Sequence, residues 1–379
     1  MPTVTEPIQM VNLTAQYQAL KEAIDATVLD TLATGQFIGG TKVKRFEQNL
    51  NAYVGSAHTI ACANGTDALQ IALMALDLQP GDEIIVPAFT YVSTAEVIGL
   101  MRLQPVMVDV DPDSFNLTDS IFRAAITPRT RAVVPVHLYG QSADMEPILA
   151  TAREAGIRVI EDNAQAIGAV YTFSDGRTAG AGTMGDVGTT SFYPSKNLGA
   201  FGDGGALFAQ EETIASTLRS IANHGQAAAR YYHDRIGVNS RLDALQAGIL
   251  DIKLAELDNY CAARRAVASQ YDAAFRGLSD IEIPYRQPNS THVFHQYTLK
   301  VKNGRRDALK AHLQQLGIPS MIYYPVPLYR QRAYQTYWDG RELPVTETLC
   351  KEVISLPMHT ELSPVALTRI IDGVNSFFE

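Results

Sequence analysis

Short, continuously apolar runs alternate with amphipathic stretches through the first half of the chain. The apolar runs lie at residues 84–86, 106–108, 132–134 and 159–160. Such runs are typical of strands that are buried on both faces. Helical spacing of apolar residues predicts helices at residues 68–76, 93–102, 117–126 and 144–155. This regular alternation predicts an α/β fold with a mostly parallel sheet between layers of helices.

The pattern differs at both ends of this α/β region. Before it, the spacing predicts helices over 16–32 and 43–54, and an apolar run that ends at Cys62. After Gly205, residues 241–278 read as one long helix of the kind that bridges two domains. Beyond it we expect a strand at 293–301, a helix at 304–316, a strand near Met321 and a terminal helix from Pro364. We therefore predict a large α/β domain over 12–255 and a small α+β domain over 256–379.

Composition narrows the class of protein. The 379 residues are 46% hydrophobic and 19% charged, which fits two globular domains. The net charge of −9 and the lack of a basic run argue against a nucleic-acid surface. The three cysteines are scattered, which favours a reducing compartment over a disulfide framework. Residues 1–10 hold no apolar signal region, and no apolar run approaches the ~20 residues of a membrane span. We expect a cytoplasmic protein.

Lys196 is the first candidate for chemistry. It lies on a connection rich in Pro, Ser and Gly, between the apolar runs 188–192 and 206–208. Burial between two strands would favour the neutral amine and make it a nucleophile toward carbonyl compounds. On this stretch alone, a solvated loop lysine is the commoner alternative.

Two further features follow predicted strands, where ligands of open α/β sheets bind. Gly65 and Thr66 begin a predicted helix and could bind an anion with their amides, although an ordinary helix cap is the alternative. Asp162 ends a buried strand and either caps the next helix or meets a cation. An anion site, a carboxylate and a desolvated lysine would together hold pyridoxal phosphate. We expect no metal, because His292 and His295 on a predicted strand would face opposite sides.

Several motifs in this sequence resemble the DegT/DnrJ/EryC1/StrS sugar aminotransferases. They are NGTDAL at 64–69, VPAFTY at 86–91, PVHLYG at 135–140, EDNAQ at 161–165, SFYPSK at 191–196, FGDGG at 201–205, HG at 224–225 and GVNSR at 237–241. The resemblance runs from about residue 11 to the C-terminal helix. It implies the aspartate aminotransferase (type I pyridoxal phosphate) fold, with a large, mostly parallel seven-stranded sheet domain and a small C-terminal α+β domain.

The resemblance also implies roles for individual residues. Lys196 would bond covalently to the cofactor and carry the proton of the transamination. The other cofactor contacts implied are Asp162 to the ring nitrogen, Gln165 to the ring oxygen, Phe89 to the ring face, and Gly65, Thr66 and Ser191 to the phosphate. Asn239 of a neighbouring subunit would complete the phosphate site, which makes a homodimer with shared active sites the functional unit. Asn163 stands where the family usually has Ala; it could add a hydrogen bond beside Asp162, with no expected effect on the reaction.

The resemblance further indicates the reaction. It is closest to the subgroup that moves an amino group from L-glutamate to C3 of nucleotide-linked 3-keto sugars, for surface polysaccharide or lipid A. We expect a UDP-2-acetamido-3-keto-hexose or a dTDP-3-keto-6-deoxyhexose. Tyr323 stands where uronate enzymes have a histidine, which favours a neutral sugar. The other sugar contacts expected are Tyr193, Arg230, Tyr232, His233 and Tyr324. Amination at C4 and, less favoured, a non-catalytic cofactor or sugar-nucleotide sensor remain alternatives.

Overall fold

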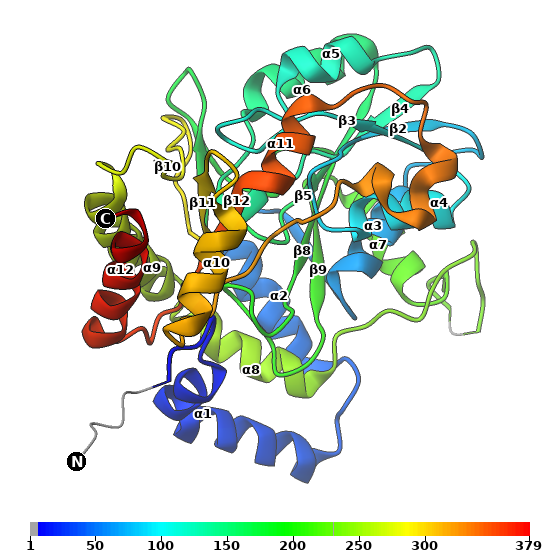
Figure 1. Ribbon diagram of the computed structural model, residues 1–379. Helices are drawn as coiled ribbons and strands as arrows, with labels where there is room; N and C mark the ends of the chain where they lie inside the picture. The colour runs from blue at the N-terminus through cyan, green and yellow to red at the C-terminus, as the bar shows by residue number, and fades with distance from the viewer. Residues whose placement is uncertain (1–6, 230) are drawn as a thin grey trace.

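Seven strands form the central sheet of the computed structural model, which describes residues 7–229 and 231–379 (Figure 1). Met1–Glu6 and the predicted sugar contact Arg230 lie outside the described residues. In sheet order the strands are β1 (His58–Cys62), β9 (Gly205–Ala209), β8 (Val187–Ser191), β5 (Arg158–Asp162), β4 (Thr130–Val133), β2 (Glu83–Pro87) and β3 (Gln104–Val108). β9 runs antiparallel to the other six strands, which are parallel to one another. The predicted mostly parallel seven-stranded α/β fold is therefore confirmed.

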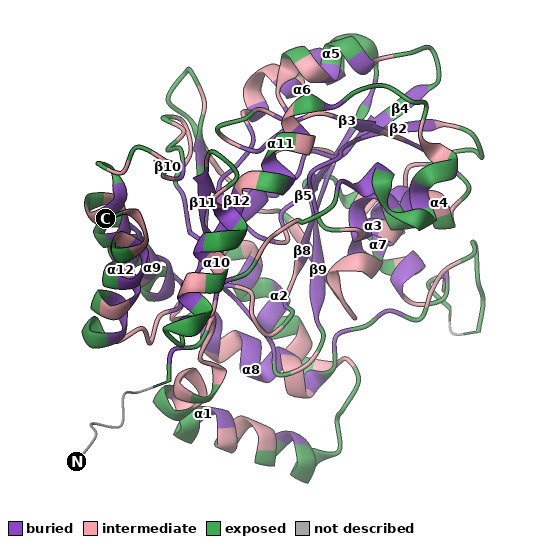
Figure 2. Ribbon diagram, in the orientation of Figure 1, coloured by how far each residue is buried: buried purple, intermediate pink, exposed green. Residues whose placement is uncertain are grey.

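Helices pack on both faces of this sheet. They are α3 (Gly65–Met74), α4 (Ser93–Leu100), α5 (Asp119–Ala125), α6 (Met145–Ala155) and α7 (Glu212–Ala222). Ile84 and Val86 of β2 pack with α3, α4 and α7, whereas Ile85 packs with α5 and α6. Because both faces are covered, every residue of β2 is buried, and the strand shows no polar alternation (Figure 2). A small hairpin of β6 (Val170–Thr172) and β7 (Thr178–Gly180) precedes β8.

The prediction of one long helix over residues 241–278 is wrong. The chain instead forms α8 (Ala244–Leu254) and α9 (Leu257–Phe275), which run in different directions (Figure 1). Leu250 of α8 packs in the core beneath the large sheet, whereas Tyr271 of α9 packs in the C-terminal core. The apolar spacing continues through the break, and Leu257 and Cys261 at the start of α9 still pack in the core of α8, so the spacing alone does not show where α8 ends. The predicted domain boundary falls at this break. Near α8 lie α1 (Leu13–Thr34) and α2 (Gly40–Val54).

A second, antiparallel sheet organises the C-terminal part of the chain. Its strands are β10 (Ile281–Glu282), β11 (Tyr297–Val301) and β12 (Val353–Leu356), and the helices beside it are α10 (Arg306–Gln315), α11 (Pro344–Glu352) and α12 (Pro364–Phe378). The strand predicted from residue 293 begins only at Tyr297, because Phe294 has a φ of 47° and interrupts extended backbone. The strand predicted near Met321 is reduced to one bridge to Ser355.

Three short 3-10 helices complete the fold: η1 (Leu138–Gly140), η2 (Leu328–Arg330) and η3 (Arg332–Tyr337). Leu328 and Tyr334 pack with the core of the large sheet, although they lie in the segment predicted as the small domain. Within residues 7–229 and 231–379, no helix has both the length and the apolar character needed to cross a membrane.

Candidate active site

The predicted site residues from three strands lie at one edge of the large sheet. β1, β8 and β5 run in the same direction, since β9 is antiparallel to both β1 and β8. Gly205, at the start of β9, pairs with both Cys62 and Ser191, the last residues of β1 and β8. The carboxyl ends of these strands therefore meet, as expected of a ligand site in an open α/β sheet.

The N-terminus of α3 forms an anion cradle at this edge. The Asn64 side chain accepts a hydrogen bond from the Asp67 amide at 2.8 Å, which fixes the helix start. The amides of Gly65 and Thr66, in the first turn, have no intrahelical acceptor. A Cβ at Gly65 would lie 2.7 Å from the Cβ of Ser191, so only glycine allows this approach to β8. The donor set and the glycine fit a phosphate group.

Asp162 holds a buried carboxylate at the end of β5. Its Oδ2 accepts a hydrogen bond from Thr94 Oγ1 at 2.9 Å, and its Oδ1 accepts one from the Ala164 amide at 3.1 Å. Among the residues that the structure describes, no Lys, Arg or His forms an ion pair with Asp162. A buried carboxylate without a paired cation suits the protonated ring nitrogen of pyridoxal phosphate.

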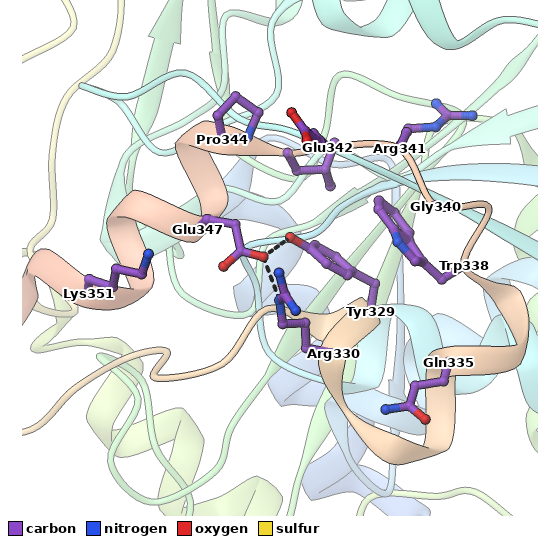
Figure 3. Close-up of a pocket in the computed structure, with 11 residues that line it drawn as sticks. Tyr329, Arg330, Gln335, Trp338, Gly340, Arg341, Glu342, Pro344, Glu347 and Lys351 are labelled. Atoms are coloured by element: carbon purple, nitrogen blue, oxygen red, sulfur yellow. Dashed lines mark hydrogen bonds and ion pairs between the residues drawn. The ribbon is translucent and has the colours of Figure 1, made fainter.

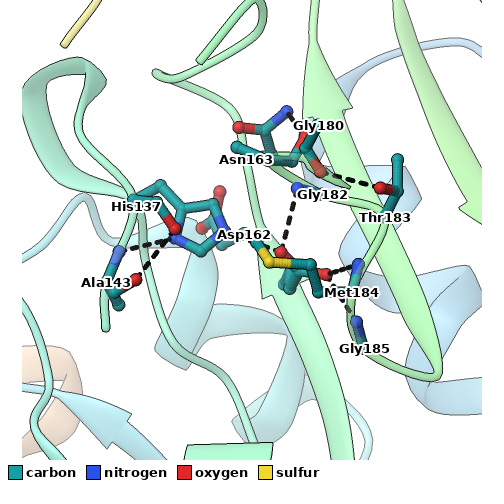
Figure 4. A network of polar contacts seen from close by, with 12 residues as sticks. His137, Ala143, Asp162, Asn163, Gly180, Gly182, Thr183, Met184 and Gly185 are labelled. Atoms are coloured by element: carbon teal, nitrogen blue, oxygen red, sulfur yellow. Dashed lines mark hydrogen bonds and ion pairs between the residues drawn. The ribbon is translucent and has the colours of Figure 1, made fainter. Parts of the chain in front are cut away.

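The neighbouring Glu161 points to the opposite side of β5 from Asp162, because successive residues of a strand alternate. Its partners His137, Gly182, Met184 and Gly185 are drawn in Figure 4. Glu161 is fully buried and accepts hydrogen bonds from His137 Nε2 at 2.8 Å and from the amides of Gly182, Met184 and Gly185 at 2.9, 2.5 and 2.6 Å. Because His137 Nδ1 accepts from the Ala143 amide, its proton is on Nε2. Glu161 therefore fixes the turn before β8, and Asp162 alone of the pair belongs to the site.

Lys196 lies on the loop between β8 and β9. Backbone hydrogen bonds from Lys196 to Tyr193 at 2.8 Å and from Ala200 to Phe192 at 2.7 Å close this loop. Burial lowers the pKa of the Lys196 amine from 10.5 to about 8, and the charge of Asp162 opposes this decrease. The amine is therefore within electrostatic reach of Asp162 and is neutral more often than an ordinary lysine. These are the properties of a nucleophile toward a carbonyl group.

Aromatic residues and one amide form the wall beside Asp162. Gln165 Oε1 accepts from the Tyr139 amide at 2.8 Å, and its Nε2 donates to the Tyr324 hydroxyl at 3.1 Å, which assigns the amide orientation. Phe89 is 1% exposed and packs edge-to-face on Tyr324, with ring centroids 6.0 Å apart. Burial raises the pKa of the Tyr324 hydroxyl, and the charge of Asp162 adds to the increase. Tyr324, Gln165 and Asp162 thus face one space.

The remaining predicted sugar contacts differ in their positions. The backbone carbonyl of Tyr323 accepts a hydrogen bond from the Tyr139 hydroxyl, and burial together with the nearby Tyr193 raises the pKa of the Tyr323 phenol. Tyr232 and His233 are exposed on the segment between α7 and α8, where His233 Nδ1 donates to the His224 carbonyl at 2.9 Å. Roles for these residues stay predictions.

Asn239, the predicted phosphate contact from a neighbouring subunit, is also exposed. Its side-chain oxygen accepts a hydrogen bond from Arg241 Nη2 at 2.7 Å, and its backbone forms a bridge with Asn223. An exposed side chain on an extended segment is available to a second chain, so the prediction of a shared site stays open.

Sequence reasoning missed several residues of the site. Thr94 bonds Asp162, and the Ser93 hydroxyl lies 2.7 Å from that of Thr66. Both begin α4, directly after the strand motif 86–91, so two hydroxyls at a predicted helix start were the available signal. Asn163, in contrast, donates to the Ala181 carbonyl at 2.8 Å, and no hydrogen bond to Asp162 involves its side chain within the described chain.

A separate surface pocket lies between η2 and α11, away from the residues above (Figure 3). Its side chains contact one another: Tyr329 stacks on Trp338 at 4.0 Å, and both Tyr329 and Arg330 donate to Glu347. These contacts occupy the Tyr329, Arg330 and Glu347 side chains. Across the described residues, no three His, Cys, Asp or Glu side chains gather as metal ligands.

The chain is similar in sequence and in structure to known aminotransferases. A model of the DegT/DnrJ/EryC1/StrS aminotransferase family matches residues 18–375. The chain is 44% identical to the UDP-2-acetamido-2-deoxy-3-oxo-D-glucuronate aminotransferase of Pseudomonas aeruginosa, over 96% of this chain and 98% of that protein. It is 43% identical to the UDP-N-acetyl-3-dehydro-alpha-D-glucosamine 3-aminotransferase of Acidithiobacillus ferrooxidans, over 97% of each. The structure of Streptomyces venezuelae DesV in complex with a ketimine intermediate matches with a TM-score of 0.94, 38% identity and 99% coverage of both chains.

Proposed function

The chain belongs to the DegT/DnrJ/EryC1/StrS aminotransferase family, and on this premise we propose that it transfers an amino group from L-glutamate to C3 of a nucleotide-linked 3-keto sugar. It is a pyridoxal-phosphate-dependent transaminase. The observation that carries the chemistry is the Lys196 amine, whose pKa is lowered to about 8 within reach of the Asp162 carboxylate. When bound, the cofactor supplies an aldehyde that accepts the amino group and a ring that draws electrons from the substrate carbon.

Separate groups of residues would bind the cofactor's phosphate, keep its ring protonated and transfer the proton. Gly65, Thr66 and Ser191 would bind the phosphate, because they form the cradle at the start of α3. Asp162, held by Thr94 and Ala164, would keep the ring nitrogen protonated. Lys196 Nζ would hold the cofactor through its aldehyde. Once the substrate's amine displaces it, the free Nζ would move a proton between the substrate carbon and the cofactor, for which a pKa near the working pH is favourable.

For the acceptor we propose a UDP-2-acetamido-3-keto-hexose, with a neutral substituent at C6. Two of the relatives act on UDP-linked 2-acetamido-type 3-oxo sugars, one of them a uronate. Tyr323 and Tyr193 lie close enough to affect each other, and burial raises the pKa of the Tyr323 phenol, which therefore stays neutral. A neutral phenol supports a hydroxyl or methyl group at C6 better than a carboxylate.

We also propose a homodimer in which Asn239 of one subunit completes the phosphate site of the other. The exposed position of Asn239 supports this arrangement. Mixing Asn239→Ala chains with Lys196→Ala chains should restore activity, because one site of the mixed dimer would hold both residues. A mixture without activity would refute the shared site. That the enzyme works in the cytoplasm stays a prediction from the cysteine pattern.

Turnover of defined sugars tests the reaction. The enzyme, L-glutamate and pyridoxal phosphate would be incubated in parallel with a UDP-2-acetamido-3-keto-hexose, its C6 uronate and a dTDP-4-keto-6-deoxyhexose. NMR of the products should show a new C3 amine from the neutral 3-keto sugar and slower turnover of the uronate. Amination of the 4-keto sugar alone would overturn the proposed regiochemistry, and faster turnover of the uronate would overturn the proposed neutral C6 substituent.

A further inference from the structure

Helix α8 forms hydrogen bonds with the loop that carries Lys196. The Lys253 Nζ on α8 donates a hydrogen bond to the carbonyl oxygen of Gly199 and lies 5.2 Å from the ring centre of Phe201. Seven residues earlier on the same helix, Gln246 accepts from the Phe201 amide at 2.8 Å and donates to the Phe201 carbonyl at 3.1 Å. The chain after Lys196 is therefore fixed to one face of α8.

The loop itself is closed tightly above this anchor. A Cβ at Gly199 would lie 2.3 Å from the carbonyl oxygen of Pro194, so the two ends of the segment 194–199 contact each other directly. Lys196 lies between these contacts, and the next residue, Asn197, donates to the Val293 carbonyl at 3.0 Å. A shift of Gly199 would consequently move the backbone on both sides of Lys196.

Lys253 is an unfavourable residue for stability at this place. It is fully buried, and burial lowers its pKa from 10.5 to about 8, with the charge of Glu361 opposing the decrease. Taking an ammonium group out of water costs free energy that an apolar side chain of similar length would avoid. Its hydrogen bond to Gly199 therefore affects the position of the loop more than it favours the fold.

We propose that Lys253 is a positioning residue, which acts through the Gly199 carbonyl to keep the Lys196 amine in its desolvated position. Burial is the main cause of the lowered pKa of Lys196, so this desolvation requires that the loop stay against the sheet. Without the Lys253 contact, the loop moves outward, water reaches the amine, and the amine returns toward the pKa of an ordinary lysine. This role rests on the proposed function, in which Lys196 is the reactive amine.

The test measures the pKa of Lys196 directly in the cofactor-free protein. Wild type and Lys253→Met would be acylated briefly with acetic anhydride over a pH series, and mass spectrometry would quantify labelling at Lys196. The midpoint of the pH profile reports the pKa independently of how accessible the amine is. We expect the Lys253→Met midpoint to lie higher by about 0.5 to 1 pH unit, which lowers the fraction of neutral amine at pH 7 by about three- to tenfold. Thermal unfolding should show that the variant is at least as stable as wild type.

Lys42→Met is the matched control. Lys42 also donates to a backbone carbonyl, that of Thr27 at 2.7 Å, but it joins α2 to α1, forms an ion pair with Asp30 and has, among the described residues, no hydrogen bond or ion pair with the segment 194–201. This variant should leave the Lys196 midpoint unchanged, even if it lowers thermal stability. A higher midpoint in both variants would mean that any loosening of the fold exposes Lys196, and this would overturn the specific role of Lys253.

The outcomes separate this proposal from the proposed function. If wild-type Lys196 itself titrates like an ordinary lysine, the reactive amine of the proposed function fails. If wild type titrates near 8 and Lys253→Met titrates equally, only the positioning role is refuted. Should Lys253→Met not fold, Lys253→Leu, whose side chain has no donor for the Gly199 carbonyl, tests the same contact. Its Lys196 must then titrate above wild type, and an unchanged midpoint would refute the role.

Discussion

The buried amine of Lys196 should destabilise the cofactor-free protein, and Lys196→Met should remove this effect. A decrease of the pKa from 10.5 to about 8 corresponds to at most about 3 kcal/mol of unfavourable free energy for the ammonium form. Lys196 as a whole residue is partly exposed although its amine is buried, and its loss leaves Asp162 without a nearby positive charge. We therefore expect Lys196→Met to be more stable than wild type by about 1–2 kcal/mol at pH 7.

The stability difference between wild type and Lys196→Met should decrease as the pH rises. Below pH 8, both the folded and the unfolded chain carry the Lys196 proton, and the folded protein bears the full cost. Between about 8 and 10.5, the folded chain loses this proton while the unfolded chain keeps it, so wild-type stability rises with pH. The advantage of Lys196→Met should therefore shrink over this range. Lys253 titrates in the same range in both proteins, and its effect cancels in the difference.

Urea titrations at several pH values, followed by the fluorescence of the single tryptophan Trp338, would measure the difference in unfolding free energy. Lys44→Met serves as the control, because Lys44 is exposed on α2 and its substitution should give a small difference that does not change with pH. The reasoning is refuted if Lys196→Met is no more stable than wild type at pH 7, or if its advantage persists at high pH. The expected result would identify Lys196 as a site where function opposes stability.

Two further substitutions test the anion cradle and the support beneath it. Gly65→Ala places a methyl group 2.7 Å from the Ser191 side chain, so we expect a loss of about 1–3 kcal/mol in stability and at least tenfold weaker binding of pyridoxal phosphate in a spectroscopic titration. Gly277→Ala, where a Cβ meets no atom within 4 Å, should leave both measurements unchanged, and an equal loss there would contradict the steric argument. Glu161→Gln replaces one of two carboxylate oxygens that accept from His137 and three amides, and should cost about 2–4 kcal/mol in urea unfolding. Intact stability of this variant would show that Glu161 does not support the turn before β8.

Local sequence determined much of this protein. Continuous apolar runs determined the parallel strands, since a strand covered on both faces needs no polar alternation, as in β2. The motif around Lys196 and the position of Asp162 at a strand end determined the candidates for chemistry. These features depend on residues close together in the chain, and their patterns are visible without the fold.

Only the tertiary structure decided which side chains meet. Thr94 and Asp162 are 68 residues apart, and Lys253 and Gly199 are 54 apart, so no local pattern pairs them. The same holds for the break after Leu254, where helical spacing continues although the later turns of α9, such as Tyr271, pack in a different core from α8. Glu161 and Asp162 are adjacent carboxylates, yet one supports a turn and the other faces the site, because strand alternation sends them to opposite sides of β5. Which side holds the site is fixed by the order of the strands in the sheet, and that order is a property of the whole chain.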